Sequence, residues 1–125
     1  MKISRLRLSA MAGSLIAIVF AVEPSFAAGA LAVGRCSYGY SFGLKTMAEA
    51  RGLALSECNS ASCKIIGTFR RQCLAYAHEF GKPCGIYGWA VRNRLNLAKE
   101  AARKFCREEG GTFCIVETAV CDTKG

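Results

Sequence analysis

The sequence predicts a small disulfide-rich α+β domain, built from two tandem ββαβ repeats with a mostly antiparallel sheet and two helices. Three observations lead to this fold class. The chain has 125 residues and eight cysteines, its cysteine pattern recurs along the chain, and it opens on an apolar segment typical of export. Once a leader of about 27 residues is removed, the remainder suits a single domain.

Residues 1–27 are expected to form a signal peptide. An apolar run over residues 8–22 follows the bases Lys2, Arg5 and Arg7. The run is shorter than the roughly 20 residues that cross a bilayer. Pro24 then precedes Ser25-Phe26-Ala27, whose small residues suit a cleavage site. We therefore expect cleavage after Ala27 or Ala28, export to the periplasm or the medium, and no transmembrane segment in the mature chain.

All the cysteines lie in the expected mature domain, residues 28–125: Cys36, Cys58, Cys63, Cys73, Cys84, Cys106, Cys114 and Cys121. An even number in a short exported chain favours a disulfide framework. Zinc is the competing interpretation, but the chain contains no C-x-x-C and its one histidine is His78. We therefore expect neither a metal site nor a cofactor.

The cysteine spacing indicates an internal repeat. Cys36, Cys58 and Cys73 recur at one constant interval as Cys84, Cys106 and Cys121, and Cys63 recurs as Cys114 after a slightly longer loop. Four residues of the expected helices recur at the same interval: Met47, Ala50, Arg51 and Ala54 match Leu95, Ala98, Lys99 and Ala102. This pattern places the first repeat at about 29–73 and the second at about 74–121.

Each repeat is expected to contain a hairpin, a helix and a third strand. In the first, strands are predicted over 30–33, 37–42 and 64–69. A helix should begin at Thr46, which forms a capping-box pattern with Glu49, and should end near Asn59. The face of Met47, Ala50, Ala54 and Cys58 should point inward.

The second repeat is expected to match the first, with strands over 74–77, 86–91 and 113–120. Its helix should cover residues 95–107 and bury Leu95, Ala98, Ala102 and Cys106. The two units would share one sheet or form two closely packed small ones. Because matching cysteines should play matching roles, the repeat favours Cys58–Cys63 and Cys106–Cys114. It leaves Cys36, Cys73, Cys84 and Cys121 unassigned.

Several segments, taken in order, resemble one known family. They are "GALAVG", "YGYSFGLKTMAEARGLALSEC", "CKIIGTFRRQC", "YGWAV" and a last strand that ends in cysteine. In this order they resemble the exported bacterial family known as domain of unknown function 4189, over nearly all of residues 29–121. The cysteines at Cys36 and Cys84 depart from the family's usual pattern. The resemblance implies a fold and an export route, and no activity that can be assigned to particular residues.

Catalytic groups are scarce, and we expect the protein not to be an enzyme. His78 and Asp122 are the chain's single histidine and single aspartate, and an even cysteine count leaves no expected thiol nucleophile. Adjacent Glu108 and Glu109 read as a solvated helix end, whereas Glu79 and Glu117 stand alone. No convergent acid–base pair is therefore predicted.

Two surface features are candidates for binding. Lys99, Arg103 and Arg107 are spaced four residues apart, so they form a basic stripe on the second helix that can bind anions or simply be solvated. Tyr87 and Trp89 belong to an aromatic group that can form an exposed platform or pack in the core. The formal net charge of the whole chain is +8.

These observations favour an exported, disulfide-stabilised binding or interaction module that acts through its surface and not by catalysis. Its partner would be an unknown protein or an anionic component of the cell envelope, and no specific nucleic acid is expected. The alternative is a structural or stress-related envelope component, held loosely on anionic surfaces by the basic helix face.

Overall fold

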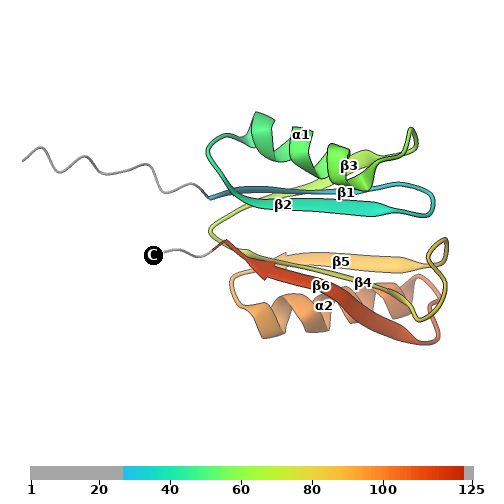
Figure 1. Cartoon of the computed structure of the whole chain (residues 1–125). Helices are drawn as coiled ribbons and strands as arrows, with labels where there is room; N and C mark the ends of the chain where they lie inside the picture. The colour runs from blue at the N-terminus through green and yellow to red at the C-terminus, as the bar shows by residue number, and fades with distance from the viewer. Residues whose placement is uncertain (1–26, 123–125) are drawn as a thin grey trace, which may run out of the picture.

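The computed structural model describes residues 27–122, and the expected signal peptide therefore lies, except for Ala27, outside the described residues. The chain order is β1 (Ala28–Val33), β2 (Tyr38–Leu44), α1 (Met47–Cys58), β3 (Lys64–Arg70), β4 (Cys73–Glu79), β5 (Tyr87–Arg92), α2 (Leu95–Glu108) and β6 (Cys114–Cys121). Two ββαβ units stack as four layers, with α1 and α2 on the outside and the sheets between them (Figure 1).

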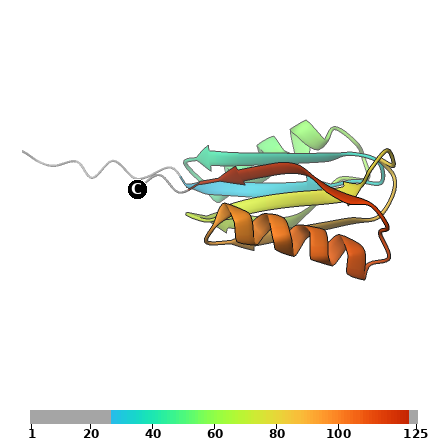
Figure 2. The same cartoon turned by 90° about the horizontal axis from the view of Figure 1, so that it is seen from below.

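The six strands in the described part of the chain form two three-stranded sheets, ordered β2-β1-β3 and β5-β4-β6. Every neighbouring pair is antiparallel. The predicted α+β class and the pair of ββαβ units are confirmed, and the units form two packed sheets instead of one shared sheet. Figure 2 shows α2 lying along the strands on the outer face of its sheet.

Alanine and glycine allow each helix to lie very close to its sheet. Ala50 and Ala54 of α1, and Ala98 and Ala102 of α2, are fully buried. A Cβ atom on Gly39 would collide with the backbone of α1, and one on Gly88 of β5 would collide with the backbone of α2. The helix–sheet cores are therefore thin and consist mainly of small side chains.

Both described helices lie where the sequence predicts them, but only α1 has a side-chain N-cap. Thr46 Oγ1 accepts the Glu49 N–H at 3.1 Å, and Asn59 ends α1 in a left-handed conformation with φ of 50°. The N-cap of α2 is Arg94, whose side chain makes no capping bond within the described chain. Leu95 was predicted to face inward. It is the first residue of α2 and is 37% exposed, so that prediction is wrong.

The larger side chains lie between the two sheets. Leu31, Val33 and Phe69 from one sheet meet Leu74 and Tyr76 from the other. The inner faces of the sheets thus bury the branched and aromatic residues that the helix faces cannot accommodate. This third core packs the two units against each other, because each three-stranded sheet would otherwise expose an apolar face.

All eight cysteines form disulfides, paired as Cys36–Cys84, Cys58–Cys63, Cys73–Cys121 and Cys106–Cys114. The two pairs favoured by the repeat are confirmed. Cys36–Cys84 connects the β1–β2 link to the β4–β5 link, and so joins the two units.

One part of the repeat alignment is wrong. Cys73, assigned to the first repeat as the counterpart of Cys121, is the first residue of β4 and therefore belongs to the second unit. Cys73 is instead the direct cross-strand neighbour of Cys121. In the first unit, Ala28 and Arg70 are paired across β1 and β3 at the matching position.

Candidate functional site: a cleft along the edge of β5

Strand β5 lies at an edge of its sheet, where it pairs with β4 alone among the described strands. The Glu79 N–H donates to the Ile86 carbonyl at 3.1 Å, and the β4–β5 register continues from there without a shift. In an antiparallel ladder, alternate residues direct their backbone groups to the same side. The backbone N–H and C=O groups of Tyr87, Trp89 and Val91 therefore point away from β4, toward the open edge.

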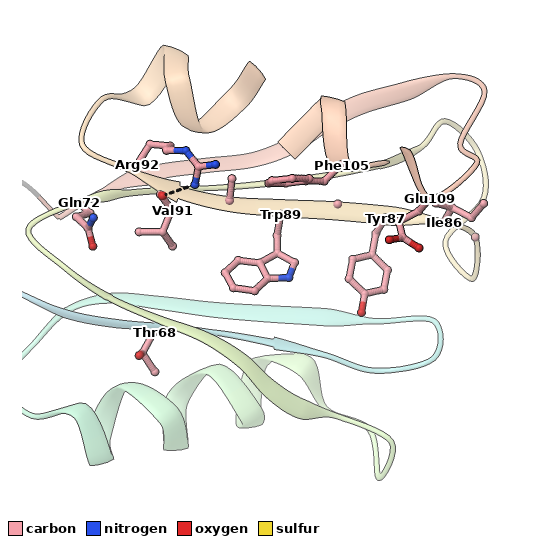
Figure 3. Close-up of a pocket in the computed structure, with 12 residues that line it drawn as sticks. Thr68, Gln72, Ile86, Tyr87, Trp89, Val91, Arg92, Phe105 and Glu109 are labelled. Carbon is pink, nitrogen blue, oxygen red and sulfur yellow. Dashed lines mark hydrogen bonds between the residues drawn. The ribbon is translucent and has the colours of Figure 1, made fainter. Parts of the chain in front are cut away.

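An open cleft of about 970 Å³ follows this edge. The cleft is lined by the whole of β5, by Thr68 and Gln72 beside it, and by Phe105 and Glu109 of the α2 region. Figure 3 shows Tyr87 and Trp89 extending from β5 toward the other sheet, while Phe105 and Arg92 lie on the α2 side. The site therefore has aromatic side chains on both faces of an exposed strand edge.

Trp89 and Tyr87, the candidate aromatic surface, pack partly into the intersheet core and also line the cleft. The ring of Trp89 covers Gly67 of β3 so closely that a Cβ atom at residue 67 would collide with it. Tyr87 lies beside Tyr76, with ring centroids 5.6 Å apart. Burial is the main reason that the pKa of Tyr76 rises to about 12, and the neighbouring Tyr87 adds to this effect.

One end of the cleft is rich in arginine. The Gln72 amide donates to Asn93 Oδ1 at 3.4 Å, which holds the β3–β4 link against the β5–α2 link. Four arginines lie close to these two residues in the chain: Arg70 and Arg71 precede Gln72, and Arg92 and Arg94 lie on either side of Asn93. Arg92 is the one that lines the cleft, and we call the four residues the arginine end. The Arg92 guanidinium donates to the Val91 carbonyl at 2.8 Å and lies 5.9 Å from the centre of the Phe105 ring.

The first unit contains a smaller counterpart of this cleft along the edge of β2. It encloses about 450 Å³ and is lined by residues 38–42 together with Leu53 and Glu57 of α1. Glu57 occupies the α1 position that corresponds to Phe105 in α2, because both residues directly precede the helix's last cysteine. The β5 cleft is thus larger. It has Phe105 where the β2 cleft has Glu57, and Arg92 is among its lining residues.

The predicted basic stripe is only partly accessible. Lys99 and Arg103 are half-buried, and Arg107 is exposed in the last turn of α2. Lys104 Nζ, beside the stripe, lies 3.8 Å from Glu108 Oε1. The stripe is therefore a weaker candidate for a binding surface than the arginine end.

The scattered titratable residues have structural contacts. His78 is half-buried in β4, where Nδ1 lies 2.7 Å from the Glu79 carbonyl and Nε2 lies 3.2 Å from Glu117. Asp122 is buried and accepts the Gly43 N–H at 3.3 Å. Within residues 27–122, no three His, Cys, Asp or Glu side chains are grouped so that they could hold a metal ion.

Glu79 was interpreted from the sequence as having no second carboxylate to act with, and the structure gives its carboxylate backbone and lysine partners. Its side chain is buried. Its carboxylate accepts the Ile86 N–H at 3.2 Å and the Thr112 N–H at 3.5 Å, and lies 3.6 Å from Lys82 Nζ. The Ile86 hydrogen bond is the largest cause of its lowered pKa, and Thr112 and Lys82 act in the same direction.

A family model described as a domain of unknown function (DUF4189) matches residues 28–121. The chain belongs to the DUF4189 family. Comparison with curated proteins and with solved structures found no match. The match covers both ββαβ units of this DUF4189 protein, and so includes the β5 cleft and all four disulfides. None of the described helices is long and apolar enough to cross a membrane.

Proposed function

We propose that this DUF4189 protein is an exported binding module that acts without catalysis and recognises a protein partner through the β5 cleft. The observation that carries the proposal is the open cleft itself, which combines an exposed strand edge with aromatic and arginine side chains. Mixed aromatic and arginine surfaces are typical of protein-binding sites.

Two further features support this proposal. Four disulfides are typical of a protein that works in an oxidising compartment. Disulfide bonding also removes every cysteine as a nucleophile, and His78 makes its contacts with Glu79 and Glu117 in β4 and β6, not in β5. The cleft therefore offers groups suited to recognition more than to proton transfer.

The test is a comparison of three immobilised proteins, each exported and purified in oxidised form. The wild type, an Arg92→Gln/Phe105→Ser cleft variant and a Phe42→Ser variant on the β2 edge are exposed to envelope extract and culture medium of the producing organism. We expect a partner that is retained by the wild type and by Phe42→Ser but lost from the cleft variant. Equal retention on all three proteins would contradict the proposal, as would the absence of any retained partner.

A second candidate function, loose attachment to an anionic envelope surface, is favoured by one other observation. Phe80 and Phe113 are 65% and 67% exposed, and their rings lie 6.1 Å apart. Exposed aromatic side chains of this kind can enter a lipid interface. Flotation with anionic liposomes should then be reduced by Phe80→Ser/Phe113→Ser, and by Lys99→Ala/Arg103→Ala/Arg107→Ala if the stripe contributes. Wild-type flotation by both variants would exclude this function.

A further inference from the structure

We infer that the ligand of the β5 cleft is an extended acidic peptide segment, which adds as an extra strand to the β5-β4-β6 sheet. This inference rests on the proposed function and names the chemistry of the partner. Strand addition is a common mode of peptide recognition, in which the backbone supplies affinity and side-chain pockets supply specificity.

The backbone of β5 is available for this pairing. The outward N–H and C=O groups of Tyr87, Trp89 and Val91 follow from the β4–β5 register. The Val91 carbonyl accepts a hydrogen bond from Arg92 (Figure 3), as an outward carbonyl at an edge can. A flexible, exposed arginine can leave this carbonyl when a peptide N–H replaces it.

Over residues 87–91 the edge lacks the usual protection against pairing, and the one charged residue of β5 is Arg92 at its end. Natural edge strands are commonly blocked by lysine, proline, an inward-pointing charge or a bulge. Residues 87–91 read YGWAV, and the β4–β5 register is continuous. A strand edge of this kind would promote unwanted association unless it serves a partner, and the positive charge beside it disfavours a second copy of the same chain.

The charges around the cleft indicate an acidic ligand. Arg92 reaches the cleft directly, and the other three residues of the arginine end are exposed neighbours of Gln72 and Asn93 in the chain. Guanidinium groups bind carboxylates through charge-assisted and often bidentate hydrogen bonds. Glu109, the residue that follows α2, also lines the cleft and carries a negative charge, so the acidic groups of the peptide should bind near Arg92.

The helix cap provides an independent indication. Arg94 occupies the N-cap of α2, with extended φ and ψ of −130° and 145°, where Ser, Thr, Asp or Asn would stabilise the helix. Its counterpart in the first unit is Thr46, which does cap α1. A position that carries a less stabilising residue is often one where function requires that residue's side chain. At this position the side chain of Arg94 extends the arginine end.

An acidic glycan is the main competing ligand, and the packing of Trp89 argues against it. Sugar rings are usually bound against the free face of an aromatic ring. The Trp89 ring covers Gly67 and is only partly exposed. The long outward backbone edge, in contrast, matches the hydrogen-bonding pattern of a peptide.

Trp89 provides the measurement, because it is the chain's single tryptophan and lines the cleft. Its fluorescence is followed during titration with a short, acetylated and amidated peptide in which valine and glutamate alternate. Three matched probes accompany it: the same peptide with lysine in place of glutamate, the same acidic peptide with every backbone nitrogen methylated, and polygalacturonate as an acidic glycan. We expect saturable binding of the unmethylated acidic peptide, with weaker binding at higher salt.

Two cleft variants and one control variant locate the site. Val91→Pro removes an outward N–H without removing a bond to β4, which an edge strand tolerates. Arg92→Gln/Arg94→Gln removes charge. Each should weaken binding of the acidic peptide by roughly tenfold or more. Phe42→Pro, at the corresponding position of β2, should bind like the wild type. Circular dichroism and intact disulfides establish that each variant is folded.

The opposing results are distinct. Equal binding of the methylated peptide would exclude strand addition, even if Val91→Pro failed to fold. Binding of polygalacturonate without the peptide would identify a glycan site. If no probe binds while the natural partner is still captured through the cleft, the strand-addition inference is wrong and the proposed function stands. If capture also fails to depend on the cleft, both are wrong.

Discussion

At the scale of single residues, one buried carboxylate holds two loops together. Glu79 accepts backbone hydrogen bonds from Ile86, after the β4–β5 link, and from Thr112, before β6. Both bonds favour the ionised carboxylate and lower its pKa, with Ile86 as the largest cause. A lowered folded-state pKa stabilises the protein above the unfolded pKa of about 4.3, and this stabilisation is lost as the pH falls through the folded value.

Glu79→Gln should therefore destabilise the protein more at pH 7 than at pH 3. Denaturant unfolding of wild type and variant at both pH values measures the difference. Glu100→Gln, which changes an exposed carboxylate on α2, is the control, and a surface change of this kind is usually worth less than about 0.5 kcal/mol. A Glu79→Gln effect that does not change with pH would mean that the ionised carboxylate contributes nothing to stability.

Two glycines should respond to substitution in opposite ways. A Cβ atom on Gly88 would meet the backbone of Ala102 and Cys106, which cannot rotate away, whereas one on Gly52 of α1 would meet nothing within 4 Å. Gly88→Ala should lower the free energy of unfolding by about 1–3 kcal/mol or prevent folding. Gly52→Ala should raise it by about 0.5–1 kcal/mol, because alanine is the better helix former. Thermal unfolding compares the two, and equal effects would contradict the close packing of α2 on β5.

At the scale of elements, the helices and strands could be predicted because their signals are local. Thr46 with Glu49 marks the start of α1, Asn59 marks its end, and alanine at helical spacing marks the face that is buried. The exposure of Leu95 could not be predicted. Whether the first turn of α2 is covered by the sheet depends on the angle at which the helix crosses the strands. The β5 cleft was not predicted either. Which strand lies at the edge of a sheet depends on how all the strands pair, and the sequence does not show that pairing.

Arg94→Thr tests whether α2 lacks the cap that α1 has. Threonine would repeat the residue found at the first unit's N-cap and should stabilise the protein by about 1 kcal/mol. The backbone of residue 94 already has the extended conformation of a capping residue, so no rearrangement is needed. Denaturant unfolding measures the gain, with Arg107→Thr near the other end of α2 as the control for lost charge. If Arg94→Thr is less stable than the wild type, the arginine contributes to the fold in a way that outweighs a cap.

At the scale of the whole molecule, the sequence indicates the two units but not how they face each other. The cysteine repeat predicts local disulfides, whose partners lie within one unit and close in the chain. Cys36 and Cys84 occupy matching links of the two units. That they pair with each other follows only once the sheets are stacked so that these links meet at one end of the molecule. The burial of the large residues between the sheets, such as Phe69 and Leu74, likewise follows only from how the sheets stack.

The Cys36–Cys84 bridge should be the first disulfide to be reduced. Both of its cysteines are exposed, whereas each of the other bridges contains a cysteine that is no more than 2% exposed: Cys58, Cys73 or Cys106. Mild thiol reduction followed by alkylation and peptide mapping should label Cys36 and Cys84 before the rest.

The Cys36→Ala/Cys84→Ala variant should remain folded, because the intersheet core and the 2.7 Å hydrogen bond between Tyr38 and Thr118 still join the sheets. Its free energy of unfolding should fall by about 2–4 kcal/mol, since the unfolded chain loses a crosslink. Earlier labelling of a buried cysteine would contradict the expected order of reduction. Loss of the fold in the double variant would show that this bridge, and not the packing between the sheets, holds the two units together.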